Sequence, residues 1–142
     1  MRDMANNMQV KKVIASISGA ADDVPIVGAI IDRQGYDSLT YLINTGVLAD
    51  ANATFTVLLE DGDAADLVAD GAAVADADMI GTEAVAGFQF DDDGEVRKLG
   101  YIGSKRYTRM TITPVGNTGA WPIGVLAVLA HAGLKPVTQA AS

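Results

Sequence analysis

Residues 84–113 read AVAGFQFDDDGEVRKLGYIGSKRYTRMTIT, and three short runs rich in apolar side chains follow one another in this segment. In the last run, Thr108, Met110 and Ile112 alternate with polar or charged neighbours, as in a strand that buries one face. Asp91–Gly94 and Gly103–Lys105 separate the runs and predict hairpin turns, because aspartate and glycine suit tight reversals of the chain. The segment therefore predicts antiparallel β-structure.

The same pattern extends over the rest of the chain, where apolar runs of strand length alternate with Gly, Asp and Asn. Ala64–Val68 favours at most one helical turn, because Asp70 and Gly71 interrupt it, and Pro114–Gly119 is interpreted as a loop. The predicted strands are Val10–Ile17, Ile26–Ile31, Ser38–Ile43, Thr54–Leu59, Ala84–Phe90, Val96–Ile102, Tyr107–Thr113 and Ile123–Ala130.

The last of these strands is a continuous apolar run. A continuous run in an antiparallel protein indicates burial on both faces, so we expect Ile123–Ala130 to be central or to lie at a subunit contact. The whole pattern predicts an all-β, jelly-roll-like antiparallel β-sandwich of about eight strands. We expect a single domain over residues 1–142, with an extended N-terminal arm at 1–9 and a C-terminal tail at 136–142.

Composition narrows the function. The 142 residues carry a formal net charge of −8, which disfavours nucleic acid as a partner, and they include no cysteine. No apolar run reaches the roughly 18 residues of a membrane span. A mean hydropathy of +0.22 points to a large core or to apolar surface that a partner covers. An acidic middle segment precedes a basic one, an order that allows head-to-tail contacts between copies or simply solvated faces.

Residues that could carry chemistry are few. His131 is the single histidine and has no cysteine or second histidine to share a metal. The oxygen pairs Asp61/Asp63 and Asp76/Asp78 leave a weak calcium site open, although they lack the spacing of an EF-hand. We therefore expect no enzymatic activity, no catalytic or metal-binding residue and no cofactor.

Several segments resemble the capsid cement or decoration proteins, which stabilise the heads of tailed bacteriophages. They are VADADMIGTEA (Val74–Ala84), GEVRKLGYIGSKRYTR (Gly94–Arg109), TPVGNTG (Thr113–Gly119) and Val125–His131. The resemblance implies a jelly-roll-like sandwich that forms homotrimers at three-fold positions of the shell. It also implies that the trimer clamps neighbouring major capsid subunits, and it supplies no catalytic residues.

From the strand pattern and this resemblance we expect a virion protein on the exterior of the capsid, made in the host cytoplasm. Its partners would be copies of itself and the major capsid protein, with no nucleic acid and no membrane. An adhesion module of a tail or fibre, or a tail or head-closure subunit, is the alternative. The expected subunit interface comprises Tyr107, Arg109, Trp121, Ile123, Val125, Leu126 and Val128.

Overall fold

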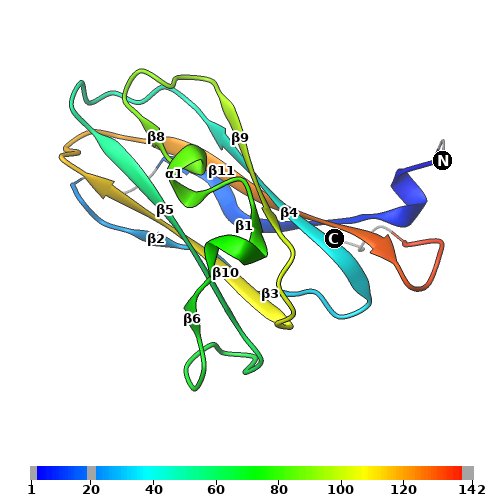
Figure 1. Ribbon diagram of the computed structural model, residues 1–142. Helices are drawn as coiled ribbons and strands as arrows, with labels where there is room; N and C mark the ends of the chain where they lie inside the picture. The colour runs from blue at the N-terminus through cyan, green and yellow to red at the C-terminus, as the bar shows by residue number, and fades with distance from the viewer. Residues whose placement is uncertain (1–2, 19–21, 139–142) are drawn as a thin grey trace.

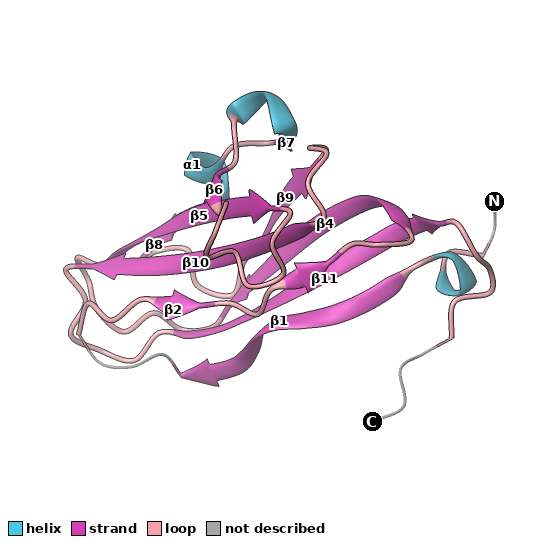
Figure 2. Cartoon of the chain, turned by 90° about the horizontal axis from the view of Figure 1, so that it is seen from below, coloured by secondary structure: helices cyan, strands magenta, loops and turns pink. Residues whose placement is uncertain are grey.

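The computed structural model describes residues 3–18 and 22–138 and forms two packed antiparallel sheets (Figures 1 and 2). The first sheet has the strand order β1-β11-β4-β9-β7. Its strands are β1 (Gln9–Ser18), β11 (Pro122–Ala132), β4 (Tyr36–Thr45), β9 (Val96–Tyr101) and β7 (Met79–Ile80). The long central strand β11 therefore pairs with a strand from the start of the chain and with one from its middle.

The second sheet has the order β2-β10-β5-β6, with β3 also paired to β10 and β8 to β5. Its strands are β2 (Ile26–Val27), β10 (Tyr107–Val115), β5 (Thr54–Gly62), β6 (Ala72–Ala73), β3 (Ile31–Asp32) and β8 (Phe88–Gln89). If the two-residue edge strand β7 is set aside, and β2 with β3 and β6 with β8 are taken as interrupted strands, the described chain has eight remaining strand positions. Their order is 1-8-3-6 in one sheet and 2-7-4-5 in the other, so the predicted jelly-roll-like sandwich is confirmed.

The space between the sheets is filled by a few aromatic side chains and many aliphatic ones. Phe55 stacks on Phe88 with ring centroids 4.8 Å apart, and Trp121 packs against Phe55 at 5.1 Å. The hydroxyl of Tyr41 lies in the same core and forms a hydrogen bond of 2.6 Å with the hydroxyl of Thr108. This bond joins the two sheets and satisfies polar atoms that would otherwise be buried without a partner.

Two of the predicted turns connect the sheets instead of closing hairpins. β8 and β10 belong to the second sheet, whereas β9, which lies between them in sequence, pairs with β4 in the first. The prediction that Asp91–Gly94 and Gly103–Lys105 are hairpin turns is therefore wrong, although the chain does reverse at both. A short polar turn serves either purpose, since the sheets of a sandwich lie only about 10 Å apart.

The predicted strand Ala84–Phe90 is a short helix, α1 (Glu83–Ala86), followed by β8. The Thr82 side chain accepts a hydrogen bond from the Val85 amide and caps this helix, which outweighs the β-propensity of a single valine. The other helical elements are the 3₁₀ turns η1 (Ala5–Asn7) and η2 (Asp76–Asp78).

β10 continues through Pro114, which the sequence places in a loop. Pro114 lies opposite Phe55 of β5, whereas β2 pairs only with Thr111 and Ile112 and ends before it. The carbonyl of Met110, four residues earlier on β10, accepts a hydrogen bond from the Gly28 amide on the β2 side. Residues two or four apart on a strand direct their backbone polar groups to the same side. The position at which Pro114 lacks an N–H therefore faces the β2 side, where no strand requires a donor.

The two ends of the described chain lie beside each other. The Val137 amide donates a hydrogen bond of 2.9 Å to the Asn6 carbonyl, so part of the predicted arm contacts the predicted tail. Residues 1–2 of that arm, residues 139–142 of that tail and residues 19–21 of the turn after β1 lie outside the described residues. The division into one domain, an arm and a tail stays a prediction. Over the described residues, no helix has the length and apolar character to cross a membrane.

We expect Trp121→Ala to lower the free energy of unfolding by about 3–5 kcal/mol, because it opens a cavity at the aromatic cluster. Denaturant unfolding followed by circular dichroism would measure this loss. Leu126→Ala is the control, since Leu126 is 44% exposed and its truncation is expected to cost less than about 1 kcal/mol. Equal losses in the two variants would contradict the assigned core.

Candidate functional site

The seven residues of the predicted subunit interface lie in three different places. Trp121, Ile123 and Val125 are buried between the sheets, with at most 2% exposed, so no second subunit can reach their side chains while the sandwich is intact. Leu126 and Val128 lie on the outer face of the first sheet. Tyr107 and Arg109 lie on the outer face of the second. The assignment of Leu126, Val128, Tyr107 and Arg109 to a subunit interface stays a prediction.

β11 is central, as expected, but within this chain only one of its faces is buried. Burial alternates along the strand, with Val125, Ala127 and Leu129 inward. The expectation of burial on both faces is therefore wrong for the isolated chain. On the outward face Leu126 is 44% exposed, whereas Ala130 lines a small pocket together with Met4, Asn7 and Met8.

The outer face of the first sheet carries one continuous band of apolar and small side chains. Cross-strand register aligns Lys12, Leu126, Leu42 and Lys98 in one row. The next row contains Val10, Val128, Thr40, Gly100 and Ile80. We call these nine residues the outer sheet face. Val10 is 47% exposed and Ile80 63%, so a large part of the band is open to solvent.

The charges of the outer sheet face have one sign. Lys12 and Lys98 flank the two leucines, and the nine residues include no carboxylate. Among the described residues, neither lysine forms an ion pair or a side-chain hydrogen bond. Most other basic side chains of the described residues form such contacts. Lys105 pairs with Asp63, Arg106 with Asp32, and Arg97 with Asp92 and Glu95. This face therefore offers free positive charge on a protein of net charge −8.

The outer face of the second sheet is different in character. Arg109 donates two hydrogen bonds to Glu60 Oε2, at 3.1 and 2.9 Å, so its charge is neutralised within the chain. The Arg106 guanidinium lies over the Tyr107 ring at 4.9 Å. Threonines 54, 56, 111 and 113 occupy the neighbouring positions. This face also exposes the apolar side chains of Leu58, Val27 and Val115, so it mixes hydroxyl and apolar groups. It differs from the outer sheet face mainly in that the Arg109 charge is already paired within the chain.

The loop Asp63–Gly71, between β5 and β6, is rigidly built and acidic. The Asp70 carboxylate accepts hydrogen bonds from the Asp63 and Ala64 amides, at 2.7 and 3.0 Å, and these bonds lower its pKa. Leu67 is buried, with φ of +56°, whereas the adjacent Val68 is 83% exposed. A Cβ on Gly71 would lie 2.3 Å from the Leu67 carbonyl oxygen, so only glycine fits there.

Two of the four carboxylates considered as calcium ligands, Asp61 and Asp63, are engaged otherwise. Asp61 accepts a hydrogen bond of 2.6 Å from the Tyr101 hydroxyl, and Asp63 pairs with Lys105 at 2.7 Å. Among the described residues, no group of three or more carboxylate, histidine or cysteine side chains is placed to hold a metal ion. His131 lies exposed near the end of β11, with its Nδ1 2.9 Å from the Ser38 hydroxyl.

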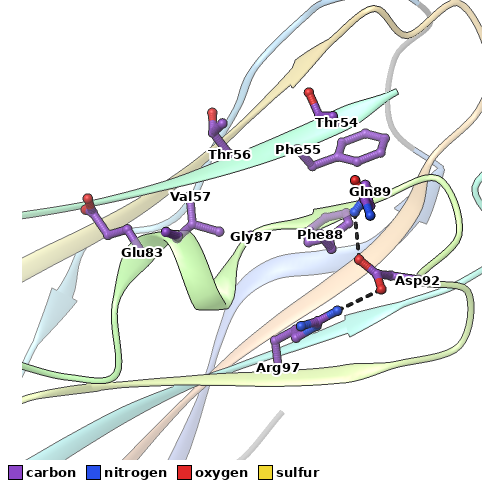
Figure 3. A pocket seen from close by; sticks show the side chains of 11 residues that line it. Thr54, Phe55, Thr56, Val57, Glu83, Gly87, Phe88, Gln89, Asp92 and Arg97 are labelled. Atoms are coloured by element: carbon purple, nitrogen blue, oxygen red, sulfur yellow. Dashed lines mark hydrogen bonds and ion pairs between the residues drawn. The ribbon is translucent and has the colours of Figure 1, made fainter. Parts of the chain in front are cut away.

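A groove of about 530 Å³ runs between β5, α1 and β8 (Figure 3). Its charged side chains are already bound within the protein. Arg97 pairs with Asp92 at 2.8 Å, Asp92 accepts the Gln89 amide, and Glu83 accepts the Leu59 amide. Sequence reasoning missed this groove because it interpreted α1 as strand. The available signal was Thr82, a good N-cap three residues before Val85.

No family model matches this sequence, and no curated protein matches it. Among solved structures, the chain is similar to the crystal structure of the infectious bursal disease virus VP2 subviral particle. The identity is 14% and the TM-score 0.48, over 94% of this chain and 32% of that one. The structure of infectious bursal disease virus Gt strain gives 14% identity and a TM-score of 0.46, over 93% and 34%. This chain spans about a third of those chains, and so distant a likeness transfers no property to it.

We expect acid to destabilise the protein partly through Asp32. Arg106 donates two hydrogen bonds to its carboxylate, at 2.9 and 2.8 Å, and this contact lowers the Asp32 pKa to about 2. The unfolded value is roughly 3.9, so the stabilisation is present above about pH 4 and is lost as the pH falls toward 2.

Asp32→Asn should therefore show a smaller loss of melting temperature between pH 5 and pH 2 than the wild type. The matched control is Asp37→Asn, since the Asp37 carboxylate takes part in no ion pair or hydrogen bond among the described residues. Identical pH dependence of the wild type and Asp32→Asn would refute the role of this ion pair.

Proposed function

We propose that this chain is a structural virion protein, a capsid cement or decoration protein without enzymatic activity. Three copies assemble on the exterior of a tailed-phage head, and the trimer clamps neighbouring major capsid subunits. The observation that carries this proposal is the outer sheet face, where Leu42 and Leu126 lie between two unpaired lysines and Val128 extends the apolar band into the next row. The segments that resemble the cement family support it independently.

A clamp of this kind requires surface that is complementary to other subunits more than it requires a reactive site. Each copy contributes a modest contact, and the sum over a trimer holds the shell through avidity. The free lysines add orientation, because charged groups around an apolar centre steer encounter and exclude wrong pairings. The rigid sandwich holds the apolar band and the lysines in fixed positions, so little conformational entropy is lost on assembly.

The proposal is tested on empty heads that were assembled without this protein. We expect the purified wild-type protein to raise the temperature at which such heads disassemble, as followed by light scattering. Leu126→Asp should give no increase, because it places a carboxylate in the centre of the outer sheet face. Val115→Asp is the matched control: Val115 is 53% exposed but lies on the second sheet, so this variant should still stabilise the heads.

Failure of the wild-type protein to bind or stabilise the heads would contradict the cement function. Stabilisation by Leu126→Asp equal to that by the wild type would contradict the role of the outer sheet face.

A further inference from the structure

Resting on the proposed function, we propose that the outer sheet face binds the Asp63–Gly71 loop of a second copy of this chain, so that copies join head to tail. The inference adds the occupant of the face, which the proposed function leaves open. It follows from two surfaces of the same chain that are complementary in both charge and apolar character.

The receiving surface is apolar at its centre and positive at its edges. Leu126 and Leu42 are paired neighbours, and Lys12 and Lys98 continue the row on either side. Lys12 and Lys98 lie on strands three spacings apart, which is roughly 14 Å at about 4.8 Å per strand. Their methylene stems can therefore approach an inserted side chain from both sides while the ammonium groups meet its neighbours.

The inserted surface has the reverse pattern. Val68 is 83% exposed, and Asp66 and Asp70 stand two residues before and after it. The Asp70 pKa is lowered by its two amide hydrogen bonds, so this carboxylate stays ionised at neutral pH. Asp66 accepts the Val68 amide through one oxygen, at 3.0 Å, and its second oxygen forms no hydrogen bond among the described residues. The loop thus presents an apolar tip between two carboxylates.

The loop is already ordered before any contact is made. Leu67 is anchored in the protein with 5% exposed, and its amide bonds to the Ala64 carbonyl at 3.0 Å. The backbone at Gly62 and Gly71 packs closely against Asp70 and Leu67, since a Cβ at either glycine would lie within 2.6 Å of one of them. A pre-ordered loop loses little entropy on binding, which favours a specific contact.

A chain cannot fill its own outer sheet face with this loop. The loop extends from β5 and β6 of the second sheet, whereas the outer sheet face is the side of the first sheet that points away from the second. Two outer sheet faces also cannot pair with each other favourably, since four lysines would meet without a carboxylate. The contact is therefore heterologous, and it closes into a trimer when each copy is rotated by a third of a turn.

The test uses two full-length variants and the solution mass by light scattering. Val68→Asp removes the apolar tip and leaves the face intact, whereas Leu126→Asp removes the face and leaves the loop intact. We expect the wild type to have three times the 14.7 kDa mass of one chain and each variant alone to have the mass of one chain. Mixed in equal amounts, the two variants should form a heterodimer, because one intact loop meets one intact face.

Both variants replace exposed side chains, and a wild-type-like melting temperature verifies their fold. Val115→Asp, on the second sheet, should remain trimeric as the matched control. A Val68→Asp trimer together with a Leu126→Asp monomer would overturn the loop as occupant while leaving the proposed function intact. A mixture that stays at the mass of one chain would also overturn it. A monomeric wild type would overturn both this inference and the trimer of the proposed function.

Discussion

The pairing of β11 with both β1 and β4 is the constraint on which the rest of the structure depends. It closes the first sheet by joining the first and last long strands to a strand from the middle of the chain. Side chains alternate along a strand, so one register decides both surfaces at once. Ile123, Val125 and Leu129 are directed into the core, and Leu126 and Val128 are directed outward. A shift by one residue would exchange these two sets.

The outward set explains why the chain is apolar beyond the needs of its core. Trp121, Phe55 and Phe88 fill the sandwich, while the leucines of the outer sheet face remain partly exposed. Burying such a face against another subunit gains about 25 cal/mol per Å² of apolar surface. In the head-to-tail contact that we propose, the acidic loop and the free lysines decide the orientation. Of the basic segment noted in the sequence, only Lys98 lies on the outer sheet face, and Arg97, Lys105, Arg106 and Arg109 form ion pairs within the chain.

Local sequence predicted the existence and type of the long strands, because alternation and turn residues are properties of neighbouring positions. It failed where distant partners decide the outcome. The Asp91–Gly94 turn has the residues of a hairpin, yet β9 leaves the second sheet to pair with β4. Thr82 capped a helix where apolar residues indicated a strand. Tyr107 and Leu126 were joined in one predicted interface, although tertiary folding places them on opposite sheets. The sequence also could not predict that Lys12 and Lys98 lack ion pairs among the described residues, since strand register decides which charged side chains meet.

The most direct measurement is zero-length carbodiimide cross-linking of an equal mixture of ¹⁴N- and ¹⁵N-labelled protein, followed by mass spectrometry. This reagent joins an ammonium group to a carboxylate only when the two are in contact. Mixed-isotope peptides that link Lys12 or Lys98 to Asp66 or Asp70 are the predicted result. Mixed-isotope links that involve only other residues, or links confined to single-isotope pairs, would contradict a head-to-tail contact through the outer sheet face.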